Sequence, residues 1–535
     1  MDSFTPSNFV APLCLLVVIL FGVWALYMYK NALKNDHWQM NSEFFLTAKN
    51  TQPWYRVAWG FYACSIGASV MFSVPQYVSD PVYGAGILGL LSYSFFSGFP
   101  FLIIANIGMY IKKRFPEVLS IGSYTKWRFG TIFAKWVIFN VLLNVGIALC
   151  AEYTAIGELF GNLLQTSAWI PILVVSIVTM VYTAAGGLYV ALLTDQIQSI
   201  FIFVVLAIVG VYLSINFRVE SFPPLPPYLG VNPIGEASVL TLGLSLTSSA
   251  MFSDAIWQRV WAAEDDDALI KGASVGSILV MFITFLFGFG GFLASWVGLV
   301  TDPNTAFLEL LKINGEIPIL ILLCVGLICS TMNEAAVDSF QIALSDTVIS
   351  LLECFDIHVT LRTTRFILIF INIPCALIGC LQLKIIGLYL ITNLLTTCLM
   401  VPLCIGMIPK LDRVVSGASA LFGSLFALSC ILIYSLLNQL QIENNGIFDF
   451  SQLTFQTFLI GIVNTFYVVY SWQPFLIAIL GSVTGVFIWY GVELVYYWIS
   501  GKERFIPNHL FEPVSSVIPV ESESSDLPSI SLVED

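Results

Sequence analysis

The chain has 535 residues, of which 58% are hydrophobic and only 10% are charged. Soluble domains average about 25% charged residues, so a soluble globular protein is excluded and most of the chain must lie in lipid. Much of the net charge of −13 comes from Glu264 to Asp267 and from the segment 503–535. No basic patch accompanies this acidity, so nucleic acid is not an expected partner.

Thirteen apolar segments are long enough, at about 20 residues each, to cross the hydrocarbon core of a bilayer. The first has no basic flank before it and no small-residue cleavage site after it, so we predict a retained span and not a signal peptide. The predicted spans are 9–29, 53–77, 84–111, 131–162, 168–185, 191–216, 237–259, 272–300, 317–350, 363–382, 385–409, 414–438 and 474–499.

Two further segments complete the chain. The segment 453–471 is apolar but contains Asn464 and Tyr467, which favours a re-entrant or external piece over a fourteenth span. From Gly501 onward the chain is polar and acidic, so a disordered tail is predicted there.

The distribution of Lys and Arg predicts the orientation. With the N-terminus outside and thirteen alternating helices, only Arg218, Lys312 and Lys384 fall outside, and every other Lys and Arg falls inside. This separation satisfies the positive-inside rule. We therefore expect a multi-pass protein of the plasma membrane with a cytoplasmic C-terminus. Its expected partners are the bilayer and a small-molecule substrate, and no obligate protein partner is evident.

Acidic residues occur inside several predicted spans, where each costs about 2.5–3.5 kcal/mol at a helix centre. No Lys or Arg is expected deep enough to pair with them, which favours the passage of a cation: sodium, a proton or a cationic substrate. The alternative is that they face water near helix ends, which fits Glu158 and Asp346 best and Glu152 least. The full set is Glu152, Glu158, Asp195, Asp254, Glu334, Asp338 and Asp346.

Helix interruption is the second signal. The second span contains Gly67, Ser69 and Pro75 within one crossing, and a broken span leaves backbone carbonyls free to bind a small hard cation. In the ninth span, Ser330 and Thr331 are adjacent hydroxyls in an apolar run. Together with free carbonyls they would form an all-oxygen cage suited to sodium, although such a pair can also bond back to its own helix.

Four segments resemble motifs of the sodium:solute symporter family, in the order that the family has them. They are EFFLTAKN at 43–50, FPEVLSIGSYTKWRFG at 115–130, YTAAGGLYVALLTDQIQ at 182–198 and WQRVWAAEDDDALIKGA at 257–273. MFSDAIWQR at 251–259 further resembles a segment of eukaryotic urea active transporters, with Asp254 displaced by one position.

The resemblance implies an all-α membrane fold whose core is two inverted five-helix repeats with broken helices. It divides the chain into a first helix with its cytoplasmic loop, two repeats, two C-terminal helices with an external loop, and the acidic tail. The corresponding ranges are 1–52, 53–216, 217–412, 413–500 and 501–535.

The resemblance also implies site residues. Sodium, or a proton in its place, would be the transported ion. Asp195 would lie on the ion path. The sodium ligands would be the carbonyls of Ala63, Ile66 and Leu327 and the hydroxyls of Ser330 and Thr331, and the candidate substrate residues are Ser65, Ser69, Glu152 and Asp254.

These features predict secondary active transport by alternating access. Sodium or proton entry would drive the uptake of a small polar nitrogen compound such as urea, choline or a polyamine, with Glu152 as counter-ion if the substrate is cationic. The alternative is a transporter-like solute sensor, although the short tail offers no folded output domain. An enzyme is not expected, because HExxH is absent and the three histidines fall in predicted cytoplasmic segments.

Overall fold

The structure is a computed structural model of the chain, and its named elements are helices. It describes the residues in eleven stretches of the chain. These ranges are 7–35, 41–115, 118–219, 221–300, 302–312, 315–383, 385–408, 411, 414–443, 455–467 and 471–501. The acidic tail from residue 502, His37 and His509 therefore lie outside the described part.

Nine helices of the described residues are long and apolar enough to cross a bilayer. Each coincides within a few residues with a predicted apolar segment or, for α8, with two of them. They are α1 (Ser7–Asn35), α5 (Gly86–Arg114), α7 (Thr131–Glu158), α8 (Trp169–Asn216), α11 (Asp266–Trp296), α13 (Ile319–Glu353), α14 (Leu361–Gly379), α16 (Gly417–Glu443) and α18 (Gln473–Ser500).

Helix α8 accounts for two predicted spans. Its 48 residues would extend about 70 Å if straight, more than twice the hydrocarbon thickness of about 30 Å. The helix bends at Gly187, where φ is 59° and ψ is −153°. This break lies between the predicted spans 168–185 and 191–216, so the two parts of α8 correspond to two predicted spans.

Two other spans are built from pairs of short helices. The second predicted span consists of α3 (Trp54–Ala63) and α4 (Val70–Ser79), with residues 64–69 between them. The seventh consists of α9 (Pro233–Met251) and α10 (Asp254–Ala262), which meet at 60°. Each pair begins one of the predicted five-helix repeats, so the interruptions recur at equivalent places.

The eleventh predicted span corresponds to α15 (Ile385–Met407). Helix α17 (Phe455–Tyr467) occupies the predicted external piece; its 13 residues extend only about 20 Å. The remaining short elements connect spans. They are α2 (Ser42–Thr47), α6 (Ile121–Phe129), a π-turn (Leu159–Leu163), a 3₁₀ turn (Pro303–Thr305) and α12 (Ala306–Glu309).

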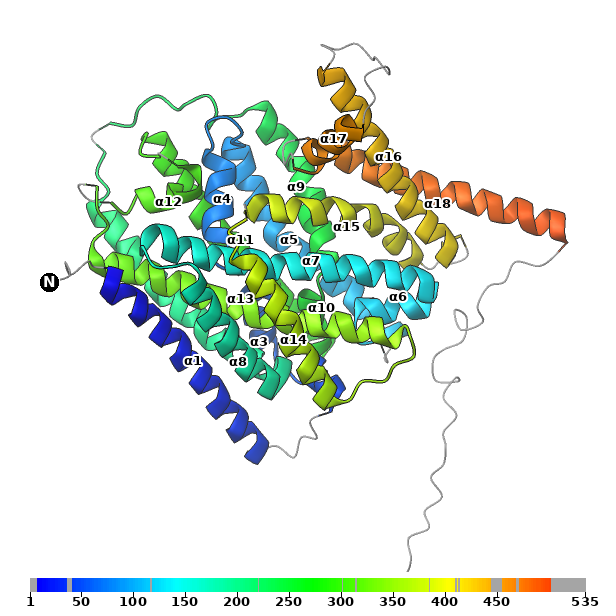
Figure 1. Cartoon of the computed structure of the whole chain (residues 1–535), viewed down its shortest axis with the longest axis horizontal. Helices are drawn as coiled ribbons and strands as arrows, with labels where there is room; N and C mark the ends of the chain where they lie inside the picture. The colour runs from blue at the N-terminus through cyan, green and yellow to red at the C-terminus, as the bar shows by residue number, and fades with distance from the viewer. Residues whose placement is uncertain are drawn as a thin grey trace, which may run out of the picture.

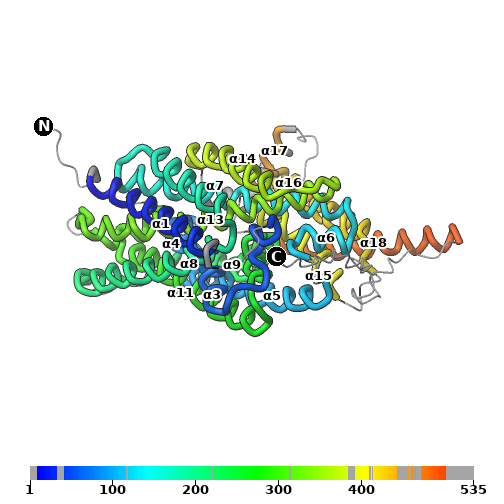
Figure 2. The backbone as a smooth tube through the Cα atoms, turned by 90° about the horizontal axis from the view of Figure 1, so that it is seen from below, coloured from blue at the N-terminus to red at the C-terminus, as the bar shows by residue number. Residues whose placement is uncertain are grey.

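Helix α13 lies at the centre of the arrangement, against α7, α8 and α1 (Figure 1). In its most apolar window 78% of the residues are buried, the highest share among the candidate spans. Helices α1 and α18 lie at opposite ends of the molecule in both views (Figures 1 and 2). Three of the predicted sodium ligands, Leu327, Ser330 and Thr331, therefore sit on the helix whose apolar window is the most buried.

Gly187→Ala is expected to destabilise the protein by about 2–4 kcal/mol. Its positive φ disfavours any side chain, and an added Cβ would lie 2.2 Å from the carbonyl oxygen of Phe45. The unfolding temperature of the detergent-purified protein measures the effect. Gly210→Ala, on the same helix with open space around it, is the matched control and should change little. An equal effect of the two substitutions would contradict the special role of Gly187.

Candidate functional site

The interruption of the second span leaves unused backbone acceptors. In this segment Cys64 N–H donates to the Gly60 carbonyl and Val70 N–H to the Gly67 carbonyl, while no backbone donor of the described residues reaches the carbonyls of Ala63 or Ile66. Leu327 differs, because it lies within the continuous helix α13, where carbonyls already accept helical hydrogen bonds. Two of the three predicted carbonyl ligands are therefore free in this structure.

The hydroxyls of Ser330 and Thr331 are also unused. Both residues are buried, at 1% exposure, and neither hydroxyl has a hydrogen-bond partner in the described structure. They do not bond back to their own helix, which was the alternative explanation for the pair. Buried hydroxyls without partners are uncommon in native proteins, and an absent ion is one of the recognised causes.

Glu152 of α7 brings the interrupted span and α13 together. The Ser69 hydroxyl donates to Glu152 Oε1 at 2.5 Å, and the Ser69 N–H lies 3.4 Å from Oε2. From α13, Asn333 Nδ2 donates to the Glu152 carbonyl at 2.7 Å and to Oε2 at 3.2 Å. Gly67 leaves the space for this carboxyl, because a Cβ there would lie 2.2 Å from it. The two segments that carry the candidate ion ligands thus share one buried carboxylate.

A cavity of about 200 Å³ opens beside the interruption. Ser65, Ser69 and Glu152 line it, as predicted for substrate residues, together with Tyr389 and Asn144. The rest of the wall is formed by hydroxyl, amide, aliphatic and aromatic side chains. Glu152 is the one acidic residue of the lining, and Lys, Arg, His and Asp are absent from it. The cavity therefore suits a small solute that is neutral or positively charged.

Asp254 does not line this cavity. It is the first residue of α10, it is buried at 2% exposure, and its Oδ2 accepts a hydrogen bond from Thr347 Oγ1 at 2.6 Å. Its neighbour Ser253 does line the cavity. The displacement by one position seen in the sequence places the carboxyl against α13 instead of the substrate space.

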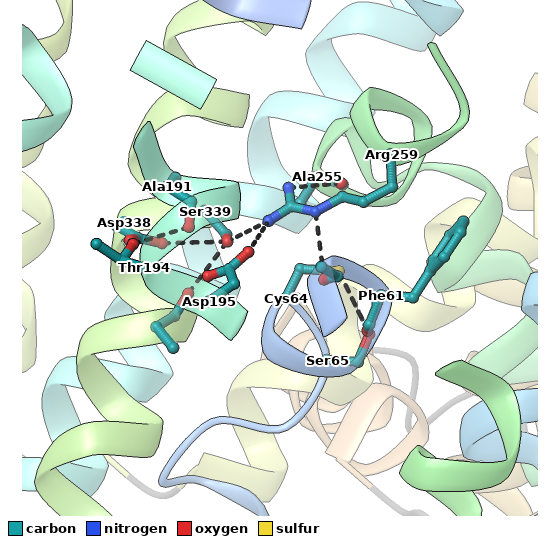
Figure 3. Close-up of polar contacts among 12 residues, drawn as sticks. Phe61, Cys64, Ser65, Ala191, Thr194, Asp195, Ala255, Arg259, Asp338 and Ser339 are labelled. Carbon is teal, nitrogen blue, oxygen red and sulfur yellow. Dashed lines mark hydrogen bonds and ion pairs between the residues drawn. The ribbon is translucent and has the colours of Figure 1, made fainter. Parts of the chain in front are cut away.

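The expectation that no basic residue lies deep enough to pair with the buried acids is wrong. Arg259 of α10 is fully buried, and its Nη2 lies 3.2 Å from Asp195 Oδ2 and 2.5 Å from Ser339 Oγ (Figure 3). Its Nε donates to the carbonyl of Gly60 at 3.3 Å. One guanidinium therefore joins α10, α8, α13 and α3.

The other acids of the spans are also inside the protein. Asp346 is buried and accepts from Gln258 Nε2 at 3.3 Å, so the expectation that it faces water is wrong. Asp338 accepts from the Tyr182 hydroxyl at 2.7 Å. Glu334 is buried, and neither carboxyl oxygen has a partner among the described residues. Glu158, half-buried at the end of α7, comes nearest to the expected water-facing position.

Sequence reasoning missed the roles of Arg259 and Asn333. Arg259 stands near the predicted end of a span, where a basic residue ordinarily marks the cytoplasmic side. The available signal for Asn333 was a polar residue directly after the Ser-Thr pair, in the apolar ninth span. Its partner is 181 positions away, a contact that no local pattern indicates.

Comparison with known proteins agrees with this geometry, although no family model matches the chain. It is 24% identical to the spermidine transporter DUR31 of Candida albicans over 503 residues, which cover 91% of each protein. It is 25% identical to a sodium/glucose cotransporter of Vibrio parahaemolyticus over 319 residues, or 54% of each. Its fold matches a Na⁺-coupled sialic acid symporter with a TM-score of 0.62 and 14% identity, covering 92% of this chain and 98% of the other.

The chain is therefore a multi-pass membrane transporter and not an enzyme. It has the all-helical fold of sodium-coupled symporters, with inverted five-helix repeats and interrupted helices. Within that class it is similar over nearly its whole length to a protein named for spermidine transport.

Proposed function

We propose that this transporter couples sodium entry to the uptake of a small organic cation, of the polyamine or choline type in preference to urea. The observation that carries the proposal is Glu152, the one acidic side chain in the cavity wall, placed beside the interrupted span. A carboxylate in a largely apolar wall attracts an ammonium group and disfavours anions. The similarity to a protein named for spermidine transport supports the same substrate class.

For the ion, we propose a site formed by the carbonyls of Ala63, Ile66 and Leu327 and the hydroxyls of Ser330 and Thr331. Sodium is a hard cation and is bound well by neutral oxygen ligands. These ligands do not titrate near neutral pH, which favours sodium over a proton. The unpartnered hydroxyls and the two free carbonyls support the assignment.

Alternating access follows from the placement of these groups. Sodium between the interrupted span and α13 would stabilise the arrangement in which the cavity accepts substrate, because it binds that arrangement better than the other. Asp195 would lie on the ion path. Its ion pair with Arg259 joins four helices and would have to open before the ion leaves. The plasma membrane, the external N-terminus and the division into repeats at 53–216 and 217–412 belong to the same proposal.

Uptake of radiolabelled spermidine, choline and urea, with sodium or with potassium replacing it, tests the proposal. We expect sodium-dependent uptake of at least one of the two cations, in excess of urea uptake. Uptake that persists in potassium and collapses with a protonophore would replace sodium by a proton. Binding of a cation without uptake would favour the solute sensor, and uptake of urea alone would overturn the substrate class.

Thr331→Ala is expected to raise the sodium concentration for half-maximal uptake about tenfold while surface expression persists. Loss of one ligand to a charged group costs about 1.5 kcal/mol, which corresponds to that factor. Thr125→Ala is the matched control, because this buried hydroxyl donates to the Gly122 carbonyl of its own helix. Unchanged sodium dependence in Thr331→Ala would remove the proposed ligand.

A further inference from the structure

Asn333 occupies a junction between the candidate ion ligands and the candidate substrate carboxylate. It lies two residues after Thr331 on α13 and is completely buried. Its Nδ2 is 2.7 Å from the Glu152 carbonyl oxygen and 3.2 Å from Glu152 Oε2. Its own Oδ1 has no partner among the described residues. Among the described residues, the two contacts with Glu152 are therefore the hydrogen bonds that orient this amide.

Glu152 is hydrogen-bonded to the interrupted span as well as to Asn333. Ser69, which precedes α4, donates its hydroxyl to Oε1 at 2.5 Å. The same interruption carries the free carbonyls of Ala63 and Ile66. Buried hydrogen bonds thus join α13, through the Asn333 amide and the Glu152 carboxylate, to the interruption that carries these carbonyls.

We propose that Asn333 is the positioning residue through which sodium binding and substrate binding strengthen each other; this inference rests on the proposed function. Sodium would hold α13 against the interrupted span and thereby present the amide to Glu152. The oriented carboxylate would then meet the ammonium group of the substrate in the geometry that binds it best. By linkage, a substrate held at Glu152 strengthens sodium binding by the same factor.

The two contacts of the amide have different parts in this coupling. The contact with the Glu152 carbonyl joins α13 to the backbone of α7 and does not depend on the orientation of the carboxyl. The longer contact, with Oε2, is the one that changes when a cation draws the carboxylate toward the cavity. Removing the amide would leave both binding sites in place, but binding at one site would no longer change the affinity of the other.

The half-saturation concentration for radiolabelled spermidine, measured at limiting and at saturating sodium, gives the coupling factor. In the full-length wild-type protein we expect a ratio of at least about five, the lower end of typical couplings. In Asn333→Ala the ratio should fall below about two. In Asn333→Ala the affinity for sodium without substrate should stay within about twofold of wild type. The sodium-induced rise in unfolding temperature of the purified protein measures this affinity.

Asn144→Ala is the matched control. Asn144 is also buried and lines the same cavity, but its amide donates to the carbonyls of Ser249 and Phe252 and not to α13. It should weaken spermidine binding equally at both sodium concentrations and keep the ratio. If Asn333→Ala does not fold, Asn333→Ser, which is too short to reach both Glu152 oxygens, should give the same loss.

A wild-type ratio retained in Asn333→Ala or Asn333→Ser would overturn the role of Asn333, as would an equal loss in Asn144→Ala. Failure of the proposed function looks different. In that case the wild-type protein itself would show a ratio near one for spermidine, choline and urea, and the inference would fall with it.

Discussion

Glu152→Gln is expected to reduce the uptake of cationic substrates at least about 100-fold. The substitution preserves the size of the side chain but removes the one acidic group in the cavity wall. A buried charge-assisted contact is worth about 3 kcal/mol, which corresponds to that factor. Uptake of radiolabelled spermidine and choline at saturating sodium measures the effect as kcat/KM, with surface expression measured in parallel.

Glu236→Gln provides the control for this prediction. Glu236 lies in the first turn of α9 and is exposed, so its loss should leave uptake unchanged. Uptake of urea, if it occurs, should be far less affected by Glu152→Gln, because a neutral molecule has no need of a counter-ion. Full activity of Glu152→Gln on both spermidine and choline would reject the counter-ion role.

Arg259→Met is expected to lower the free energy of unfolding by about 3–5 kcal/mol. The guanidinium is fully buried, and its removal leaves the Asp195 carboxylate inside the protein without a positive partner. Arg259 also donates to Gly60 and Ala255 carbonyls and to Ser339, so several acceptors lose their donor together. A lower unfolding temperature of the purified protein and reduced surface expression would report the loss.

The double variant Arg259→Met, Asp195→Asn distinguishes the cost of an unpaired Asp195 carboxylate from the cost of losing the packing of the Arg259 side chain. It removes both members of the ion pair, so we expect it to be more stable than Arg259→Met alone. Lys271→Met is the exposed control, since Lys271 pairs with Asp267 at the surface and should contribute little. Equal stability of the single and double variants would show that the unpaired carboxylate is not the cause of the loss.

The spans could be predicted from sequence because hydropathy is a local property. The interruption at residues 64–69 was also predictable from the sequence. Gly67 and Ser69 lie in an otherwise apolar run, where such residues favour a break in the helix. The same holds for the two crossings of α8, which the Gly-Gly turn at Gly187 separates. Ser65 and Ser69 line the cavity because they lie on that interruption, whereas Glu152 lines it from α7.

The contacts between distant residues could not be predicted in this way. Arg259 follows an interruption that directs α10 into the protein, whereas its place along the chain indicates the membrane surface. Asp254 misses the cavity because one residue of displacement turns its side chain toward α13. The orientation of a side chain around its helix axis depends on which helices surround it, and this is a property of the assembled bundle.

The interrupted second span also has an electrostatic consequence. A helix carries about half a positive charge at its N-terminus and half a negative charge at its C-terminus. Helix α3 ends at Ala63, so its negative end faces the carbonyls offered to a cation, whereas α4 begins at Val70, after the Ser69 N–H that approaches Glu152. The C-terminus of α3 thus favours a cation and the N-terminus of α4 favours an anion, a few residues apart. The positive end of α4 therefore favours the ionised form of the Glu152 carboxyl, and that charge would attract an incoming cation.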